Sequence, residues 1–171
     1  ISFVNFYRKN ITDLNSIFYR CGSLKRIDLS HFNTINVTNM YGMFTQCNLL
    51  KEIDLSKFKT NKVVDMSWMF YECESLEELN LSNFNTDNVI KMYEMFYGCK
   101  SLKYLNLLNF NTSKVTELYY MFSKCLRLEK IIISNFYINE KADQTSMLKF
   151  CHKNVKDELM KINTTIKKEA L

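Results

Sequence analysis

Six cysteines recur at a constant spacing of 26 residues, and cysteine is the residue type here most able to do chemistry. They are Cys21, Cys47, Cys73, Cys99, Cys125 and Cys151. Zinc sites take ligands at close spacings such as Cys-X-X-Cys, and these cysteines have no such spacing. Equivalent side chains in stacked repeats lie alongside one another, which disfavours disulfides. Because free cysteine is among the most buried residue types, we predict a reduced, buried ladder of thiols.

Other residues that could support catalysis are few and scattered. The two histidines, His31 and His152, neither recur in a repeat nor adjoin a plausible nucleophile pattern. The three glycines, Gly22, Gly42 and Gly98, are too far apart for a glycine-rich phosphate-binding loop. We therefore predict that the protein is not an enzyme and has no metal site and no cofactor.

The cysteine spacing belongs to a repeat that covers most of the chain, and a fixed period of this length is typical of a solenoid. In each period a segment such as 76–81 carries apolar residues that alternate at its end, which predicts a short strand. The segment 89–99 carries apolar residues on one face of a helix of about three turns. Thr86 or Asn88 can provide the N-cap of that helix, since a short side-chain oxygen accepts from its first N–H groups.

Apolar residues of the same type return at equivalent positions in successive repeats. They include the strand positions Ile27, Ile53, Leu79, Leu105 and Ile131, the turn positions Phe32, Phe58, Phe84, Phe110 and Phe136, and the helix positions Met43, Met69, Met95, Met121 and Met147. Their helical or alternating spacing favours a core over a ligand pocket. We expect Phe84 to be a core residue, and Asn83→Ala to cost little stability.

These patterns predict an α/β fold: a right-handed β-α solenoid of the leucine-rich-repeat kind, because strand-crossover-strand connections are overwhelmingly right-handed. A parallel sheet would line the concave side and helices the convex side. Neighbouring strands lie about 4.8 Å apart, whereas packed helices lie about 8–10 Å apart. This mismatch should bend the stack with the strands on its inner side.

The two ends depart from the repeat. The chain begins with Ile1 inside a strand position, so we expect an incomplete first repeat and a chain that is either a cut piece or a processed product. The sixth repeat is irregular, and the period stops after Cys151. Apolar residues at Val155, Leu159, Ile162 and Ile166 then follow one helical face. We predict six repeats over residues 1–151 and a C-terminal helical cap over residues 152–171.

Composition excludes several classes of protein. The chain has 171 residues, of which 47% are hydrophobic, so it can bury a core and is not a disordered segment. Its net charge is +5, but the repeats are nearly neutral, which argues against nucleic-acid binding. No run of 18 apolar residues is present, so no membrane insertion by this segment is expected.

Two surfaces are candidates for partner binding. On the concave sheet the predicted contact residues are Arg26, Asp28, Glu52, Asp54, Glu78, Asn80, Tyr104 and Asn106. Their acidic centre, with an aromatic neighbour, favours a basic protein surface and association that slows as salt is raised. On the helix flank the alternative residues are Trp68, Tyr71, Tyr93, Tyr97 and Tyr120. Residues of this kind also fill grooves between neighbouring helices, so both interpretations of the flank stay open.

The segment 24–47 reads Leu-Lys-Arg-Ile-Asp-Leu-Ser-His-Phe-Asn-Thr, then Val-Thr-Asn-Met-Tyr-Gly-Met-Phe-Thr-Gln-Cys after two residues. This pattern resembles the BspA-like leucine-rich repeats of 26 residues that are common in mycoplasma surface lipoproteins, other bacterial surface proteins and some protists. The resemblance covers about residues 1–151. It implies a leucine-rich-repeat solenoid at the cell surface or outside the cell, with a role in adhesion or in binding a host ligand.

Two functions therefore stay open. The resemblance favours a surface module for macromolecular recognition or adhesion. The alternative is a cytoplasmic scaffold or assembly subunit that uses the same repeat surface, since reduced cysteines are typical of that compartment.

Overall fold

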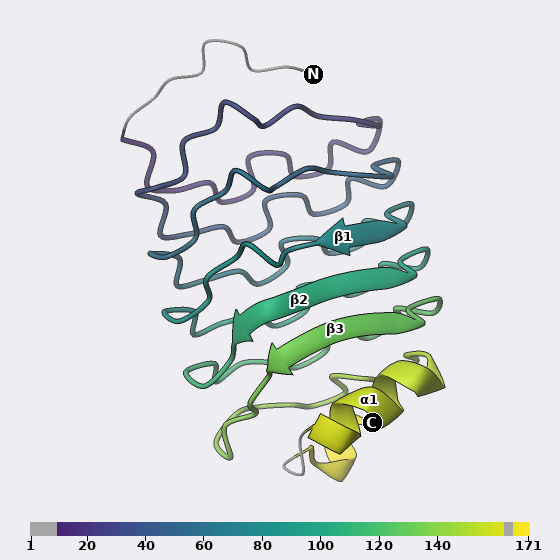
Figure 1. Cartoon of the computed structure of the whole chain (residues 1–171). Helices are drawn as coiled ribbons and strands as arrows, with labels where there is room; N and C mark the ends of the chain where they lie inside the picture. The colour runs from purple at the N-terminus through teal and green to yellow at the C-terminus, as the bar shows by residue number, and fades with distance from the viewer. Residues whose placement is uncertain (1–9, 163–165) are drawn as a thin grey trace.

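The computed structural model describes residues 10–162 and 166–171. Successive repeats form coils that stack one below another, with the strand segments together on one side (Figure 1). Three of these segments are regular strands: β1 spans Glu78–Asn80, β2 spans Tyr104–Asn111 and β3 spans Lys130–Asn135. They form a parallel sheet in the order β1-β2-β3, which confirms the parallel sheet expected from the repeat.

The register of this sheet follows the repeat. Leu79 pairs with Leu105, and Leu105 pairs with Ile131, so residues 26 positions apart lie opposite one another. All three side chains are buried, while the residues beside them point outward or are only partly covered. Alternation of this kind places one face of each strand in the core and the other on the surface, which we call the strand face.

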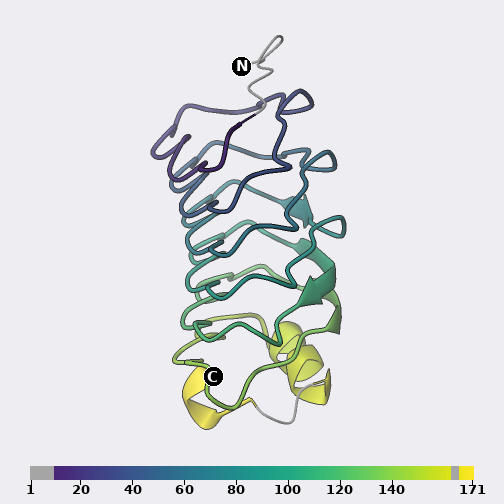
Figure 2. The same cartoon turned by 90° about the vertical axis from the view of Figure 1, so that its left-hand side faces the viewer.

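Within residues 10–162 and 166–171, the predicted helices are absent from the side of the stack opposite the strands, so that part of the fold prediction is wrong. Residues 93–98 form consecutive turns, and Figure 2 shows such turns lying above one another in successive coils. Parallel bridges join Asn39 to Asp65 and Asp65 to Lys91. Backbone N–H groups also donate to the next repeat, as from Met92 to the carbonyl of Glu117 at 3.0 Å. We call residues 13–21 and their equivalents the turn segments.

Hydrogen bonding between turn segments explains why helices cannot form there. Chains that are hydrogen-bonded side by side lie about 4.8 Å apart, whereas packed helices need about 8–10 Å. The strand side and the turn side therefore rise by similar amounts in each repeat. The concave sheet and convex helical side were predicted from the difference between strand spacing and helix spacing. That difference does not arise here.

Backbone conformation gives a second reason. Two positions in each turn segment have a φ between 52° and 71°, the left-handed region. The first position is occupied by Ser16, Gly42, Trp68, Glu94, Tyr120 and Ser146, and the second by Arg20, Gln46, Glu72, Gly98, Lys124 and Phe150. A residue in this conformation interrupts a right-handed helix. The apolar spacing of residues 89–99 is therefore produced by turns that repeat every four residues.

Threonine links neighbouring repeats where the N-cap was expected. The Thr86 hydroxyl donates to the carbonyl of Asn111 at 2.9 Å and accepts from the N–H of Asn111 at 2.8 Å. Thr60 makes the same pair of hydrogen bonds to Asn85. Both threonines are buried. Thr86 thus provides hydrogen-bond partners for the backbone of Asn111, the last residue of β2 in the next repeat.

Stacked phenylalanines run through the core between the two sides. Phe44, Phe70, Phe96 and Phe122 follow one another with ring centroids 5.6–5.8 Å apart and nearly parallel planes. Each is fully buried. The methionines of the turn segments are buried beside them, so the Met and Phe positions form core, as the sequence predicts.

The C-terminal part contains the α-helix α1, Lys153–Ile162, and a short 3₁₀ helix, η1, Lys168–Ala170. Helix α1 packs against β3 at the end of the stack, and its Val155 and Leu159 are buried (Figure 1). The predicted strand positions near Ile1 lie outside the described residues. The division into repeats at 1–151 and a cap at 152–171 stays a prediction.

Candidate functional site

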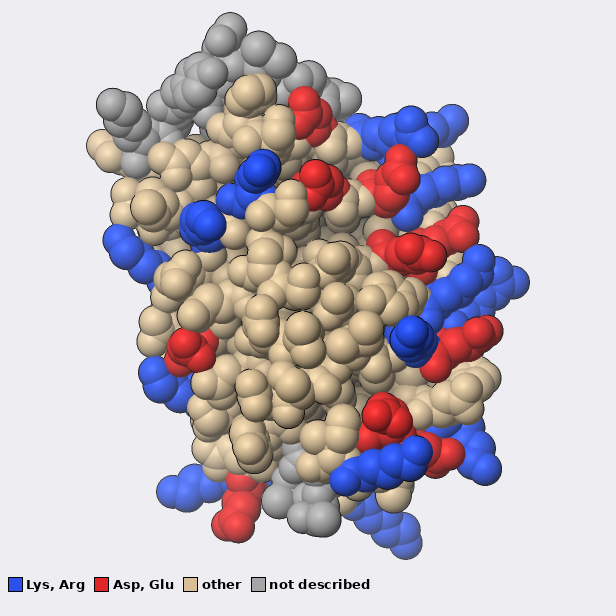
Figure 3. Space-filling model, in the orientation of Figure 1, with Lys and Arg blue, Asp and Glu red and all other residues tan. Residues whose placement is uncertain are grey.

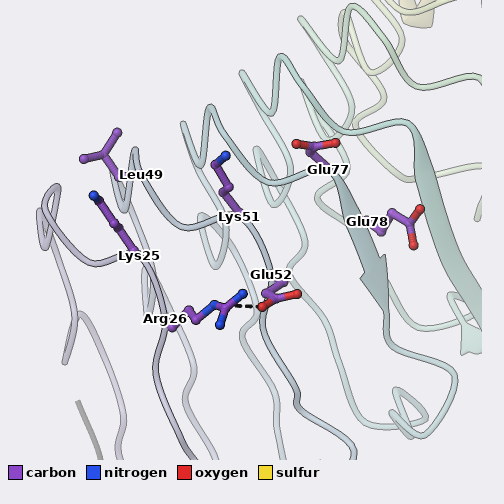
Figure 4. A pocket seen from close by; sticks show the side chains of 7 residues that line it. All are labelled: Lys25, Arg26, Leu49, Lys51, Glu52, Glu77 and Glu78. Atoms are coloured by element: carbon purple, nitrogen blue, oxygen red, sulfur yellow. Dashed lines mark ion pairs between the residues drawn. The ribbon is translucent and has the colours of Figure 1, made fainter.

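A charged patch lies at the N-terminal end of the strand segments. It consists of Lys25, Arg26, Lys51, Glu52, Glu77 and Glu78, which together with Leu49 line a cavity of about 550 Å³. Figure 4 shows these side chains, drawn from three successive repeats. The repeat structure brings them together because equivalent residues of neighbouring coils lie side by side. Three of the predicted contact residues, Arg26, Glu52 and Glu78, belong to this charged patch.

Ion pairs between repeats organise the charged patch. Arg26 Nε lies 2.9 Å from Glu52 Oε1, and Lys103 Nζ lies 3.0 Å from Glu77 Oε2. The hydrogen bond from Lys103 lowers the pKa of the Glu77 carboxyl. Both pairs are exposed, and exposed ion pairs contribute little to stability because water and salt screen them. The patch therefore keeps its charges available to a partner at little cost in stability.

Charges are distributed unevenly over the patch. The basic residues Lys25, Arg26 and Lys51 lie toward the first repeats, and Glu77 and Glu78 lie toward β1 (Figure 4). Glu78 is exposed and has no ion pair within residues 10–162 and 166–171. Figure 3 shows acidic and basic side chains along one border of the strand face, while its middle carries few.

Four of the predicted contact residues have a structural role instead of a free side chain. The Oδ1 atoms of Asp28, Asp54, Asn80 and Asn106 each accept from the backbone N–H two residues ahead, at 2.9–3.1 Å. This local hydrogen bond fixes the turn that follows the strand segments at Asp28, Asp54 and Asn80, whereas Asn106 lies within β2. The N–H of Ser56 lowers the pKa of Asp54 in this way.

Tyr104, the remaining predicted contact residue on the strand face, begins β2 and is partly covered. Lys130 Nζ lies 5.7 Å from the centroid of its ring. A cation over an aromatic ring is favourable, so this lysine already occupies a position from which a partner could contact Tyr104.

Aromatic side chains of the turn segments form a continuous aromatic band on the side where helices were expected. It contains the five predicted flank residues, Trp68, Tyr71, Tyr93, Tyr97 and Tyr120, together with Tyr41 and Tyr119. All are partly covered. Ring contacts bring these residues together, and turns hold them in place of the expected helices.

Ring stacking occupies much of the aromatic band. Trp68 stacks on Tyr71 at 4.7 Å and Tyr71 stacks on Tyr97 at 4.9 Å, measured between ring centroids. Lys124 Nζ lies 4.8 Å from the Tyr97 centroid. Burial raises the pKa of Tyr71 to about 12, with neighbouring carboxylates adding to the shift. A partner would thus meet ring edges and hydroxyl groups more than open ring faces.

All six cysteines are unpaired. Four are buried, and Cys21 and Cys151 are partly covered. The Sγ atoms of Cys73 and Cys99 donate to the carbonyls of Phe44 and Phe70, at 3.1 and 3.2 Å. Burial raises the pKa of Cys47 and of Cys99 to about 12. These thiols are therefore protonated donors within the core.

Four residues that line the cavity of the charged patch were not predicted from the sequence. Lys25, Leu49, Lys51 and Glu77 line the cavity but lie outside the alternating pattern from which contact residues were chosen. For Lys25, Lys51 and Glu77, the signal in the sequence is the charge at position 25 and at the equivalent positions 51, 77, 103 and 129. Every one of these five positions holds a lysine or a glutamate.

No group of three or more His, Cys, Asp or Glu that could hold a metal ion occurs in residues 10–162 and 166–171. Within the same ranges, no helix has the length and apolar character needed to cross a membrane.

Comparison with known proteins finds a matching family model and solved structures with a similar fold. The family model described as "Mycoplasma protein of unknown function, DUF285" matches residues 2–103 and 48–162. The crystal structure of the T. pallidum leucine-rich-repeat protein TpLRR is similar with a TM-score of 0.51 and 15% sequence identity. The similarity covers 92% of this chain and 79% of that chain, and it shows the fold alone. No curated protein matches the chain.

Proposed function

We propose that this chain, which belongs to the DUF285 family of Mycoplasma proteins of unknown function, is a non-enzymatic module that recognises another protein. We further propose that its repeats are BspA-like and that they form a right-handed solenoid. Leucine-rich-repeat folds present side chains from several repeats on one extended surface, which suits protein binding.

The observation that supports this function best is the charged patch. Three repeats contribute six charged side chains to one cavity, and most of them are exposed to solvent. A core requires none of these charges, since the buried residues of the strand segments are apolar. Exposed charged groups around a cavity can bind a partner without disturbing the fold.

The partner that suits the patch is a protein with a basic surface that reaches Glu52 and Glu78. Glu78 has no competing ion pair in the part of the chain that the structure describes. A basic group that approaches β1 can pair with Glu78, whereas Glu77 is already held by Lys103 at 3.0 Å. We place the module at the cell surface, where its partner would be a host ligand and its role adhesion.

The proposal is tested by incubating the immobilised chain with an array of purified secreted and surface proteins. We expect at least one binder whose association rate falls about tenfold with Glu52→Lys or Glu78→Lys, and also falls as salt is raised. Asp157→Lys makes the same change of charge on the exposed side of α1 and is the control. It should leave the rate unchanged.

Two results would contradict this proposal in different ways. Failure to bind any protein on the array would argue against a recognition module. Binding that survives both charge reversals but is lost with Tyr97→Ala would move the contact to the aromatic band. Each variant is first checked for folding by thermal unfolding.

A cytoplasmic scaffold is the second candidate, and the six unpaired cysteines favour it. Free thiols persist most readily in a reducing compartment. Protease treatment of intact cells that express the protein separates the two locations. Digestion of the protein in intact cells supports the surface module, and protection until the cells are lysed supports the scaffold.

A further inference from the structure

Asparagine side chains line a groove at the C-terminal end of the strand segments, opposite the charged patch. The groove has a volume of about 490 Å³. It is lined by Asn83, Phe84, Asn85, Asp87, Asn109, Asn111, Asn135 and Tyr137. Neither lysine nor arginine is among these residues, and Asp87 is the single carboxylate. We call this the asparagine groove.

Three asparagines at equivalent positions have side-chain oxygens that accept no hydrogen bond within the described residues. Asn83, Asn109 and Asn135 occupy equivalent positions in three successive repeats. The Nδ2 groups of Asn83 and Asn109 donate to backbone carbonyls of the preceding repeat. Their Oδ1 atoms, and both polar atoms of Asn135, have no hydrogen bond within the described residues. Neighbouring strands lie about 4.8 Å apart, so these oxygens recur along the groove at about that interval.

A second set of amides holds the carboxylate in place. Asn85 Nδ2 donates to Asp87 Oδ2 at 3.0 Å, and Asn111 Nδ2 donates to Asp87 Oδ1 at 2.8 Å. Both amides belong to the groove. Because each carboxylate oxygen keeps further acceptor capacity, Asp87 is a fixed acceptor that can also receive hydroxyl groups.

Tyr137 adds an exposed aromatic ring to these acceptors. Its side chain is 62% exposed, the largest exposed fraction of the large hydrophobic residues described. No ring contact or cation covers it within residues 10–162 and 166–171, in contrast with the tyrosines of the aromatic band. An apolar ring face beside polar acceptors can pack against the C–H face of a sugar while its hydroxyl groups are bound.

We propose that the asparagine groove binds a neutral oligosaccharide. Sugar hydroxyls are donors spaced along a polymer, and they match a column of amide and carboxylate acceptors. The absence of lysine and arginine from the lining disfavours a phosphorylated or sulfated ligand, and a single carboxylate gives little attraction for a basic peptide. This site is separate from the charged patch and goes beyond the protein recognition proposed above.

The test is a titration of the full chain with neutral hexasaccharides of glucose, N-acetylglucosamine, mannose and xylose, followed by calorimetry and by NMR of the asparagine side-chain amides. We expect one of them to bind with a dissociation constant of about 0.1–1 mM, typical of a shallow polar site. Its binding should shift the amide signals of Asn109 and Asn135. A sulfated hexasaccharide should bind more weakly.

Substitutions in the asparagine groove test whether the oligosaccharide binds there. Tyr137→Ala and Asn135→Ala should each weaken binding at least about fivefold, whereas Tyr137→Phe keeps the ring and should bind nearly as well as the unmodified chain. Tyr19→Ala removes an exposed tyrosine elsewhere and is the control. Glu78→Lys should leave sugar binding intact, so a failure of the charged patch and a failure of the groove are distinguishable.

Three outcomes would overturn the inference. The first is absence of binding for every neutral hexasaccharide at 10 times the expected dissociation constant. The second is binding that Tyr137→Ala and Asn135→Ala leave unchanged. The third is preferential binding of an extended peptide in the groove, which would make it a protein contact.

Discussion

Buried thiols are the residues whose chemistry the fold changes most. Cys73, Cys99 and Cys125 are completely buried, and their Sγ atoms donate to backbone carbonyls. Burial raises the pKa of each of these thiols, and Cys99 reaches about 12 from an ordinary value of 9.0. Because the thiolate is the reactive form, the core thiols should be inert toward metals and oxidants while the chain is folded.

The raised pKa of the thiols predicts a loss of stability at alkaline pH. A pKa that is higher in the folded than in the unfolded chain stabilises the fold fully below the unfolded value. That contribution disappears as pH rises through the folded value. For Cys47 and Cys99 this window runs from about 9 to about 12. Urea unfolding at pH 8, 10 and 11 measures it, and the double variant Cys47→Ser, Cys99→Ser should lose less stability over this range. Equal losses would show that other groups cause the effect.

The sequence predicts most buried residues correctly, because a column that is apolar in every repeat has one structural explanation. Phe84 is fully buried, as expected. The same reasoning does not extend to polar residues such as Asn83. Its Nδ2 donates to the carbonyls of Leu55, Ser56 and Phe58 at 3.0–3.3 Å. Asn83→Ala would leave these acceptors without that donor, so its cost is larger than the sequence indicates. An exposed polar residue in a pattern does not reveal its hydrogen-bond partners.

At the scale of elements, the turn segments decide the shape of each repeat. Their residues at left-handed φ would be unfavourable in most proteins, costing about 1–2 kcal/mol each for residues other than glycine. Hydrogen bonds to the next repeat hold them in place, as from Glu94 N to Tyr119 O at 3.0 Å. A single repeat could not keep this conformation, because its partners lie in its neighbours.

Gly98 tests the cost of these turns. It has a φ of +71°, and an added Cβ would lie 3.0 Å from Cγ of Glu72. Gly98→Ala should therefore destabilise the protein by about 1–2 kcal/mol in urea unfolding. Gly22→Ala is the matched control, since the Cβ there meets backbone oxygen no closer than 3.8 Å and no left-handed φ is required. It should be neutral or stabilising by up to about 1 kcal/mol. Similar losses in both variants would mean that φ is not the cause.

The strands could be predicted from the sequence and the turn segments could not, for a physical reason. Apolar residues three and four positions apart fit one face of a helix, and they fit a series of turns equally well. Hydrogen bonding between repeats distinguishes the two, as in the bridges between Asp65 and Lys91. The same limit applies to the candidate site. Recurrence at equivalent repeat positions led to the prediction of Arg26, Glu52 and Glu78 as contact residues. The asparagine groove could not be predicted in this way, because it depends on which side-chain amides are already hydrogen-bonded to the backbone.

At the scale of the whole molecule, each repeat is covered by its neighbours, so the last repeat needs a different cover. Helix α1 packs against β3 and buries Val155 and Leu159 there. In a stack where each repeat contacts only adjacent ones, stability is a sum of terms between neighbours. Loss of this cover should therefore act mainly on the repeats beside it.

Leu159→Ala tests how far the effect of α1 extends along the stack. Leu159 is completely buried, so its truncation should cost about 2–5 kcal/mol. Hydrogen exchange should show the loss of protection in β3 and residues 142–148, with little change in residues 66–96, because the interfaces between inner repeats are unaltered. Met160→Ala removes a neighbouring side chain that is 47% exposed and should change stability by less than about 0.5 kcal/mol. If Leu159→Ala lowered protection equally in every repeat, the stack would unfold as one cooperative unit, and α1 would stabilise the charged patch and the asparagine groove alike.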